Sequence, residues 1–420
     1  MTDIHKISVE AKKASVITAT LKTEFKNKIL NRIADNIENS VDKIINANLE
    51  DLKNAKNDLE SGKISQSVYN RIKADEHKLA EMIQGIRDVA KLDDPVNKTI
   101  FTRELAEGLI LKKVTCPIGV IGVIFEARPD VIAQISSLAI KSGNAVILKG
   151  GKETNITNSV IFKIISDTVS EFPEYPQNAI NLIHSREEAS QMLAEDKFID
   201  LIIPRGSNKL VKYIQENTKI PVLGHASGIC HIYADEFCDT QKALKIIEDA
   251  KCQYPSACNA VETVLVHKNI AEKFIPLFKE RMEKASVKIN FEEDVADWAK
   301  EYGEKELSLK VVDNITAAIE HINTYGSGHT DCIITENKGN AEIFMNFVDS
   351  AGVYQNASTR FADGFRYGFG AEVGISTNKT HARGPVGLEG LTIYKYKLYG
   401  NGDTVGEFCH GKRKFTHKDL

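Results

Sequence analysis

The fold of this chain is constrained most by an alternation of short apolar runs and helical segments in its second quarter. Runs of β-branched and aliphatic residues occur at 145–148, 180–183 and 201–203, and helical patterns occur at 132–142 and 156–169. Strands that alternate with helices form parallel sheets, because each parallel crossover needs a long connection such as a helix. The sequence therefore predicts an α/β fold whose ligands bind at the carboxyl ends of the strands.

The first part of the chain has a helical pattern. Apolar residues recur every four positions on a background of charged and amide side chains, at Phe25, Ile29, Ile33, Ile37 and Val41. This spacing is typical of an amphipathic helix. We expect a helical packing layer from about residue 12 to residue 92, followed by a β-ribbon at 102–115.

The composition is that of a globular protein with several domains. With 420 residues, 42% hydrophobic and 27% charged, the chain can form two or three cores. Lys and Arg total 54 against 58 Asp and Glu, so a net charge of −4 gives no sign of a nucleic-acid surface. The basic residues at 410–420 are expected to form a solvated tail.

Seven cysteines and the lack of an apolar leader indicate the compartment. The number of cysteines is odd, and no two of them have the close paired spacing typical of a zinc site. We therefore expect reduced thiols, a cytoplasmic location and no metal. Cys230 and His231 are neighbours on a predicted strand and point to opposite faces, which argues against a shared metal ion. The apolar runs are also too short for a signal or a membrane span.

Cys258 lies in a polar turn between a predicted helix that opens at Thr240 and a predicted strand at 261–266. Pro255, Ser256 and Asn259 mark the turn. A thiol that a rigid scaffold holds in a connection can act as a nucleophile. Plain packing is the alternative, because free cysteine is among the most buried residue types.

Two strand ends carry residues that suit an anionic cofactor. Lys149 and Lys152 flank two glycines directly after the strand at 145–148, so two ammonium groups can meet a phosphate there. Gly206 and Ser207 lie just after the predicted strand at 201–203, where Ser207 can cap a helix whose amides face an anion. Each feature alone also fits an ordinary loop, but together they favour a nucleotide site.

The segment at 356–390 is rich in Gly, Arg, Ser and Thr, which predicts a loop that faces the substrate. We expect substrate contacts from Asn356, Ser358, Arg360 and Arg383. Either arginine can meet a substrate anion, and structural hydrogen bonds are the alternative role.

Nine segments, in order along the chain, resemble one family. They read PIGVIGVIFEARPDV, AVILKGGKE, DLIIPRGS, PVLGHASGICHIYAD, PSACNAVETVLVH, YGSGHTDCIITEN, VYQNASTRFADG, FGAEVGIS and HARGPVGLEGLT. Nearly the whole chain is covered. In these segments it resembles the γ-glutamyl phosphate reductases, a phosphate-releasing family of the aldehyde dehydrogenase superfamily.

The resemblance implies an aldehyde dehydrogenase-like fold of three parts. A Rossmann-type NADPH-binding domain would comprise residues 1–100 and 117–224, and an α/β catalytic domain with the nucleophilic cysteine would comprise 225–385. Residues 101–116 and 386–420 would form a small oligomerisation flap. A homodimer or homotetramer is therefore expected.

The implied reaction is the NADPH-dependent reduction of L-glutamyl 5-phosphate to L-glutamate 5-semialdehyde, the second step of proline biosynthesis from glutamate. A thiolate at Cys258 would displace phosphate to give a thioester, which hydride then reduces. Val222 occupies the position of the glutamate that hydrolytic relatives carry, so the reaction would not end in hydrolysis. Association with glutamate 5-kinase is expected, because an acyl phosphate is labile in water.

The resemblance also assigns the remaining site residues. Arg128 stands near the position of the oxyanion-binding asparagine of hydrolytic relatives, while the Cys258 amide and the Asn259 side chain are alternative oxyanion donors. Lys149 would contact the adenosine ribose, and Lys152 replaces a glutamate of NAD-preferring relatives and so favours NADPH. Gly224 and Glu301 would also contact the cofactor, Glu301 at the nicotinamide ribose.

Four positions depart from the usual family pattern, and two other readings stay open. The departures are Tyr254, Ser227, Phe365 and Arg366, and they affect substrate and phosphate contacts rather than the reaction class. A hydrolytic or coenzyme A-acylating aldehyde dehydrogenase is the second enzyme reading. A catalytically silent relative is the reading from a different class.

Overall fold

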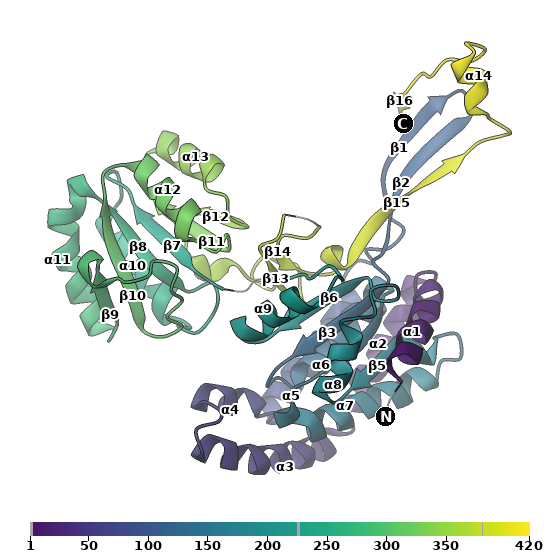
Figure 1. Cartoon of the computed structure of the whole chain (residues 1–420), viewed down its shortest axis with the longest axis horizontal. Helices are drawn as coiled ribbons and strands as arrows, with labels where there is room; N and C mark the ends of the chain where they lie inside the picture. Colours follow the sequence, from purple (N-terminus) through teal and green to yellow (C-terminus); the bar gives the residue numbers. More distant parts are fainter. Residues whose placement is uncertain (1–2, 225–226, 380) are drawn as a thin grey trace. The chain divides into compact units, whose positions relative to one another are not determined.

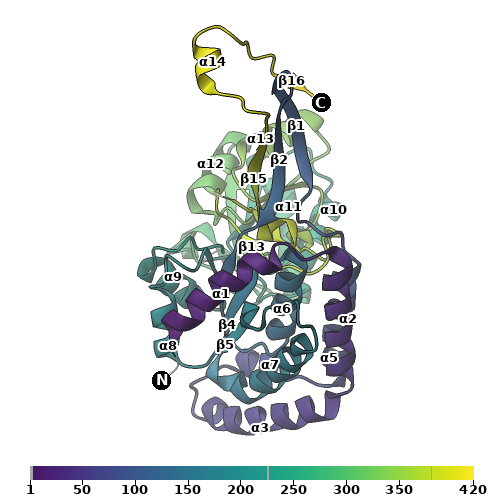
Figure 2. The same cartoon turned by 90° about the vertical axis from the view of Figure 1, so that its right-hand side faces the viewer.

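The computed structural model describes residues 3–224, 227–379 and 381–420 (Figure 1, Figure 2). The chain divides into two compact units. The first unit comprises Met1–Leu223 and Gly387–Leu420, and the second unit comprises Gly224–Val386. Each has its own parallel sheet.

Five helices open the first unit, as the helical pattern predicts. They are α1 (Ile4–Thr18), α2 (Thr23–Glu38), α3 (Val41–Glu60), α4 (Gln66–Ile72) and α5 (Glu76–Lys91). The four-residue spacing places Ile29, Ile33 and Ile37 on one side of α2, where each is at most 1% exposed. The predicted layer is therefore built from five helices separated by short turns.

The sheet of the first unit has the strand order β5-β4-β3-β6 and is entirely parallel. Its strands are β3 (Val120–Phe125), β4 (Ala145–Lys149), β5 (Ile180–Ile183) and β6 (Leu201–Arg205), and the helices that follow them are α6 (Asp130–Ser142), α7 (Asn155–Ser170), α8 (Arg186–Met192) and α9 (Asn208–Asn217). Every residue of β3 and β4 is buried, as expected for central strands of a parallel sheet covered by helices. The predicted alternation is confirmed.

A separate antiparallel ribbon belongs to the same unit. Its strands are β1 (Thr99–Ala106), β2 (Leu109–Pro117), β15 (Thr392–Tyr399) and β16 (Lys418–Asp419), in the order β15-β2-β1-β16. Figure 1 shows β15 alongside β2, and their register runs from Thr392 opposite Pro117 to Tyr399 opposite Ile110. Segments almost three hundred residues apart in the chain thus form one sheet.

The C-terminal residues are largely exposed, as their charge predicts. They are also tied to the ribbon, because β16 pairs with β1. Arg103 Nε donates to Asp419 Oδ1 at 2.6 Å. This backbone pairing with an open strand edge is not visible in a charged sequence.

The second unit has a six-stranded parallel sheet in the order β12-β11-β7-β8-β10-β9. Its strands are β7 (Cys230–Ala234), β8 (Val261–His267), β9 (Lys288–Phe291), β10 (Glu306–Val312), β11 (Thr330–Ile334) and β12 (Gly352–Gln355). Helices α10 (Thr240–Cys252), α11 (Lys268–Lys284), α12 (Ile315–Tyr325) and α13 (Lys338–Phe347) connect them, and β13 (Gly374–Ser376) pairs with β14 (Gly384–Val386).

Alternate residues of the central strands enter two different cores. Val264 of β8 packs with Phe274 and Phe278 of α11, whereas Leu265 packs with Ile319 of α12 and Phe344 of α13. Successive side chains of a strand point to opposite faces of the sheet. The uninterrupted apolar run of β8 is explained by this burial on both faces.

The segment at 290–306 is rich in charged residues, a pattern that favours an irregular loop. In the structure it begins within β9 and the short 3-10 helix Glu292–Asp294, and it ends at the start of β10. Only residues 295–305 lie outside these elements. The strand β10 is not predicted from the sequence, because Glu306 and Lys310 interrupt its apolar pattern.

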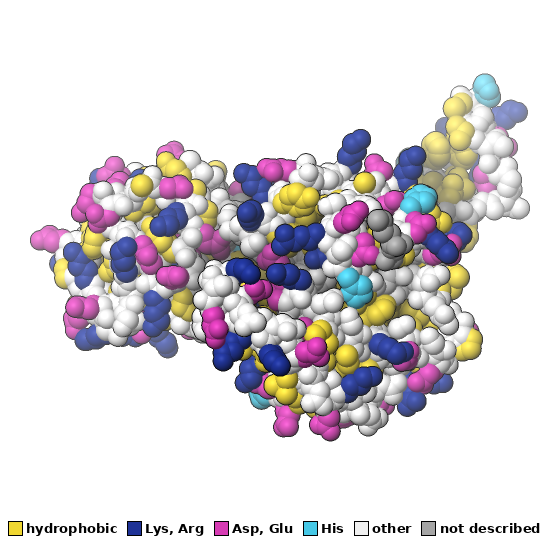
Figure 3. All heavy atoms as spheres, turned by 60° about the horizontal axis from the view of Figure 1, so that its bottom comes forward, with side chains coloured by type: hydrophobic (Ala, Val, Ile, Leu, Met, Phe, Trp, Pro, Cys, Tyr) yellow, Lys and Arg dark blue, Asp and Glu magenta, His cyan; other side chains and the backbone are white. Residues whose placement is uncertain are grey.

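The surface carries charges of both signs. On the face shown in Figure 3, Lys and Arg side chains are interspersed with Asp and Glu side chains. This distribution agrees with the near balance of 54 basic and 58 acidic residues. No helix in the described part of the chain has the length and apolar character needed to cross a bilayer.

Candidate active site

Cys258 lies in the turn that joins α10 to β8, three residues before the strand begins, and its side chain is half-buried. Two backbone hydrogen bonds form the turn: Ala257 N donates to Tyr254 O at 3.1 Å, and Ala260 N donates to Ala257 O at 2.9 Å. The predicted position of the thiol between a helix and a strand is confirmed.

Gly228, just before β7, packs directly against the backbone of Cys258. A Cβ atom at this position would lie 2.1 Å from the Cys258 carbonyl oxygen and 2.5 Å from its Cα. Cys230 Sγ also lies 3.4 Å from the same carbonyl oxygen. Only glycine allows this approach, so the neighbouring strand fixes the backbone of the thiol turn. The sequence analysis did not single out Gly228, although glycine directly before a strand is a signal for close packing.

Asn259 is 4% exposed, and its Nδ2 donates to the carbonyl oxygen of Ala362 at 2.8 Å. Its Oδ1 accepts no hydrogen bond from the described residues. The side chain therefore ties the thiol turn to the segment that carries Arg360.

Arg360 lies beside the thiol turn. Its side chain donates from Nε to Gln253 Oε1 at 2.9 Å, and its guanidinium carbon is 5.8 Å from the centroid of the Tyr254 ring. Burial lowers the pKa of Arg360 from its usual value, Arg366 lowers it further, and the thiol of Cys258 opposes the shift. Two of the positions that depart from the family pattern, Tyr254 and Arg366, are thus neighbours of Arg360.

The other two predicted substrate residues near this segment have structural contacts. Ser358 is 5% exposed and accepts a hydrogen bond from Arg360 N at 3.3 Å. Asn356 accepts from Thr335 N at 3.0 Å and donates to Thr335 O at 2.9 Å. Because Asn356 follows β12 and Cys258 precedes β8, the parallel sheet places them at opposite edges.

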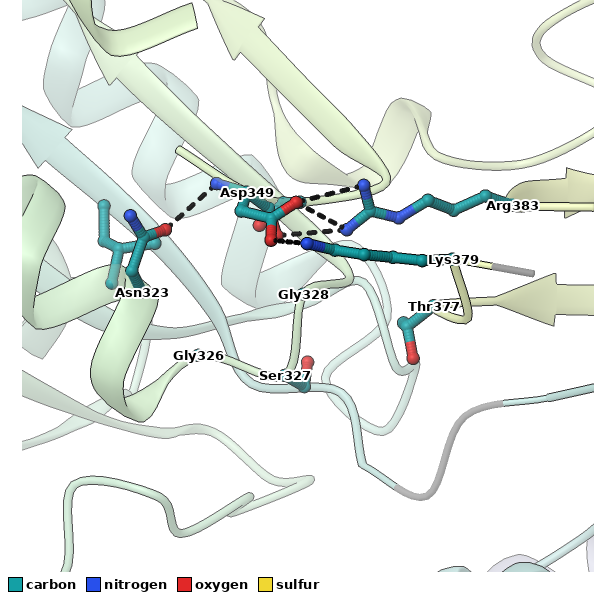
Figure 4. A pocket seen from close by; sticks show the side chains of 10 residues that line it. Asn323, Gly326, Ser327, Gly328, Asp349, Thr377, Lys379 and Arg383 are labelled. Atoms are coloured by element: carbon teal, nitrogen blue, oxygen red, sulfur yellow. Dashed lines mark hydrogen bonds and ion pairs between the residues drawn. The ribbon is translucent and has the colours of Figure 1, made fainter. Parts of the chain in front are cut away.

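Arg383 lines a cavity of about 370 Å³ in the second unit (Figure 4). Its Nη1 and Nη2 each lie 3.2 Å from Asp349 Oδ1, and Lys379 forms an ion pair with the same carboxylate. Lys379 is the main cause that lowers the pKa of Asp349. Ser327, also on the cavity wall, accepts from Ile229 N at 2.9 Å. Arg383 and Lys379 thus share the single carboxylate of Asp349.

A buried ion pair flanks the thiol turn. Lys251 Nζ lies 3.1 Å from Glu262 Oε2, and the two residues are 0% and 1% exposed. Glu262 also accepts hydrogen bonds from Tyr302 N at 3.2 Å and Gly303 N at 3.4 Å. The half-buried residue Glu301 directly precedes these two donors. Glu262 is not recognisable as a site residue from the sequence, because its partners lie in other elements.

Five residues of the thiol turn, the cavity and the neighbouring loops share one edge of the second sheet, opposite to Asn356. Glu301 precedes β10, Cys258 precedes β8, Gly228 precedes β7, Ser327 precedes β11 and Asp349 precedes β12. In a parallel sheet these positions all lie at the amino ends of the strands. The amino edge therefore presents the thiol with polar groups on both sides.

In the first unit, Lys149 is the last residue of β4 and is 9% exposed. Burial lowers its pKa, and the carboxylates of Glu153 and Glu126 act against that shift. Lys152, whose side chain is 73% exposed, lies 3.5 Å from Asp58. The two lysines thus differ in their surroundings, one buried at the strand end and one on the surface.

Ser207 caps α9, as predicted, by accepting a hydrogen bond from Leu210 N. The carboxylate of Glu126 lies at the same helix end, where Ser207 N donates to its Oε2 at 2.8 Å. A Cβ at Gly206 would lie 2.5 Å from this oxygen. An anionic group of the chain itself therefore occupies the position where the sequence predicts an anion.

The remaining predicted residues lie near the same sheet. Arg128 is half-buried in the loop between β3 and α6, where its carbonyl accepts from Val131 N at 3.3 Å. Val222 forms a parallel bridge with Ile202 of β6. Gly224, the first residue of the second unit, is buried, and His225 and Ala226 of the same motif lie outside the described residues.

Comparisons with known proteins identify the family. Residues 1–297 match the model of the aldehyde dehydrogenase family. The chain is 57% identical to the γ-glutamyl phosphate reductase of Brachyspira hyodysenteriae, covering 98% of both chains, and 51% identical to that of Methanococcoides burtonii, covering 100% of this chain and 97% of the relative.

Solved structures of the same family and of more distant relatives share the fold of this chain. The crystal structure of γ-glutamyl phosphate reductase from Thermotoga maritima is similar with a TM-score of 0.91 and 36% identity, over 96% of this chain and 100% of the other. An acetylating aldehyde dehydrogenase from Geobacillus thermoglucosidasius shares the fold at 16% identity, with a TM-score of 0.66 over 96% and 97% of the chains. These similarities confirm the expected aldehyde dehydrogenase-like fold. The chain therefore belongs to the aldehyde dehydrogenase family and, within it, to the γ-glutamyl phosphate reductases.

Proposed function

We propose that this chain reduces L-glutamyl 5-phosphate to L-glutamate 5-semialdehyde with NADPH and releases phosphate, as the second step of proline biosynthesis. The observation that carries the proposal is the half-buried thiol of Cys258 in a turn that Gly228 fixes from the neighbouring strand. A nucleophile must be both reachable and held in place. Family membership supplies the substrate class.

Cys258 performs the covalent chemistry. Its thiolate attacks the acyl carbon, the bond from that carbon to the phosphate oxygen breaks, and inorganic phosphate leaves. Reduction of the resulting thioester, followed by cleavage of the carbon–sulfur bond, releases the aldehyde and regenerates the thiolate. The Asn259 Nδ2 donates one of its two N–H groups to Ala362, and the backbone N–H of Cys258 and the other Nδ2 N–H are the donors available to the oxyanion.

Phosphate release needs positive charge near the thiol. Arg360 is buried beside the turn and interacts electrostatically with Cys258. We assign to Arg360 the binding of the acyl phosphate or the stabilisation of the thiolate. Arg128, at the carboxyl end of β3, would bind the departing phosphate. Arg383 is paired with Asp349, so it would bind a substrate anion only in exchange for that contact.

The first unit would hold the cofactor, and its residues fit a nucleotide. At Gly151 and Gly206 the backbone passes close to carboxylates of the chain, since an added Cβ would lie 2.0 Å from Glu153 Oε1 or 2.5 Å from Glu126 Oε2. Lys149 and Ser207 lie at the same carboxyl edge. Lys152 would pair with the 2′-phosphate, which makes NADPH the preferred form. When bound, NADPH supplies the hydride for the thioester carbon.

Val222 explains why the thioester would not be hydrolysed. It bridges to β6 and has an apolar side chain, so it provides no carboxylate to activate water. A hydrolytic or coenzyme A-acylating reaction is the alternative function. In both, turnover would not depend on inorganic phosphate.

The reverse reaction tests the proposal directly. Pyrroline-5-carboxylate, the cyclic form of L-glutamate 5-semialdehyde, is the substrate of this assay together with NADP⁺. We expect NADPH to form only when inorganic phosphate is present, and we expect Cys258→Ser to abolish its formation. Phosphate-independent turnover would overturn the proposed reaction. Turnover with coenzyme A in place of phosphate would support the acylating alternative.

The ribbon would support a homodimer or homotetramer. Five large apolar or aromatic residues of β15 are 42–56% exposed: Ile393, Tyr394, Tyr396, Leu398 and Tyr399. Exposed apolar strands favour association. Sedimentation of the purified chain tests this, and co-sedimentation with glutamate 5-kinase tests the proposed kinase partner.

A further inference from the structure

The buried ion pair Lys251–Glu262 connects two loops at the amino edge of the second sheet. Lys251 lies near the end of α10 and Glu262 is the second residue of β8, so the pair brackets the turn that carries Cys258. Both side chains are excluded from water, with 0% and 1% exposure. The pair is therefore a fixed contact rather than a surface one.

The carboxylate of Glu262 also holds the loop before β10. Its two oxygens accept from the backbone N–H groups of Tyr302 and Gly303. The Tyr302 hydroxyl lies 2.8 Å from Ser308 Oγ of β10, and Gly303 has a φ of 65°. The backbone that follows Glu301 is thus held by Glu262 on one side and by β10 on the other.

Stability alone does not explain a charged pair at this place. A buried ion pair loses hydration that its attraction seldom exceeds, and apolar residues of similar volume are often as stable. Burial raises the pKa of Glu262 to about 7, while Lys251 and the two backbone donors favour its ionised form. A carboxylate, unlike an apolar side chain, can receive hydrogen bonds from two backbone amides at once.

We propose that Lys251 and Glu262 are positioning residues that fix the Glu301 loop relative to the thiol turn. This inference rests on the proposed function and on the role at the nicotinamide ribose that the family resemblance implies for Glu301. In that role, Glu262 aligns the hydride donor with the thioester on Cys258. Lys251 favours the ionised form of Glu262 and holds its carboxylate toward the loop.

Two double variants isolate the hydrogen bonds to the loop. Lys251→Met/Glu262→Gln and Lys251→Met/Glu262→Met have the same charge and similar volume, and only the first retains an acceptor for Tyr302 or Gly303. Neither leaves a buried charge without a partner. We expect kcat of the reverse reaction to be about tenfold lower in the Met/Met chain than in the Met/Gln chain. Equal kcat values would overturn the proposal.

Repeating the comparison in a Glu301→Ala chain separates an effect transmitted through Glu301 from a general loss of structure. If Glu262 acts through Glu301, the difference between the two double variants disappears once Glu301 is alanine. A difference that persists unchanged would show that Glu262 acts by another route and would contradict the inference. Alkylation of Cys258 by iodoacetamide should proceed at the same rate in both chains, because the thiol turn itself is unaltered.

The chain provides a matched control for the loss of a buried pair. Lys26 is 0% exposed and lies 3.0 Å from Asp94 in the first unit. Lys26→Met should lower Tm while kcat and KM stay unchanged. If the Met/Met chain does not fold, Lys251→Met/Glu262→Val replaces it, because valine suits a strand position.

The affinity for NADPH tests the positioning role without relying on the proposed reaction. The same set of variants is titrated with NADPH alone, and the Met/Met chain should bind it more weakly than the Met/Gln chain only when Glu301 is present. A wild-type chain that binds NADPH but shows no phosphate-dependent turnover would contradict the proposed reaction, and the titration would still decide the role of Glu262. Equal affinities together with equal kcat values would reject the inference.

Discussion

The two parallel sheets of this chain present their site residues at opposite edges. In the first unit, Lys149, Arg128 and Ser207 follow strands and lie at the carboxyl edge. In the second unit, Cys258 and Glu301 precede strands and lie at the amino edge. The carboxyl edge is the usual binding edge of an α/β sheet, so the second unit departs from the rule that its sheet topology predicts.

The difference follows from the helix ends at each edge. Helices begin at the carboxyl edge of the first sheet, and their N-terminal amides carry partial positive charge that suits cofactor phosphates. At the amino edge of the second sheet, α10, α12 and α13 end, which places partial negative charge there. Side-chain cations then have to stabilise anions at that edge, which is the role proposed for Arg360 beside the thiol turn.

The largest effect is expected from the amino edge. Cys258→Ser should lower phosphate-dependent turnover by at least about a thousandfold, because the hydroxyl is a far weaker nucleophile than the thiolate. Cys252→Ser is the control, since Cys252 lies on α10 and is not in the turn. Loss of activity in both variants, measured with NADP⁺ and phosphate, would point to a structural role for the thiols.

Gly228→Ala tests whether the neighbouring strand fixes the turn. The added methyl group would overlap the Cys258 backbone, so we expect kcat to fall about a hundredfold through misplacement of the thiol. The free energy of unfolding should fall by about 1–3 kcal/mol. Gly85→Ala is the control, because a Cβ there meets nothing within 4 Å and alanine favours a helix by about 0.5–1 kcal/mol. Unchanged kcat in Gly228→Ala would mean that the turn adapts.

The sequence predicts the fold better than the site. Buried strands such as β8 have long apolar runs, so their positions can be predicted. In β10, Glu306 and Lys310 interrupt the apolar pattern, and the strand is not predicted. Cys258 is recognisable from its turn and from the family motifs. The contacts of Gly228 and Glu262 are not, because their partners lie about 30 to 40 residues away in the chain and meet only when the strands pair.

Charge reversal at Lys152 tests the carboxyl edge. Lys152→Glu would replace attraction for a 2′-phosphate by repulsion, so the preference for NADPH over NADH should fall by about tenfold to a hundredfold. Lys163→Glu on α7 is the matched control, because its side chain is similarly exposed at 66%. The ratio of kcat/KM for the two cofactors is the measurement. An unchanged ratio would place the 2′-phosphate away from Lys152.

The smallest effect is expected from Glu126, whose carboxylate lies at the N-terminus of α9. Glu126→Gln keeps an acceptor for Ser207 N and removes a negative charge that competes with the cofactor phosphates. NADPH should therefore bind about threefold more tightly, in line with the energy of one charge at a helix end. Titration of NADPH fluorescence measures this, with Glu171→Gln, an exposed residue of the same unit, as the control. Weaker binding would instead show that Glu126 contacts the cofactor. Side chains would then contribute to ligand binding at the carboxyl edge of the first sheet as much as they do at the amino edge of the second.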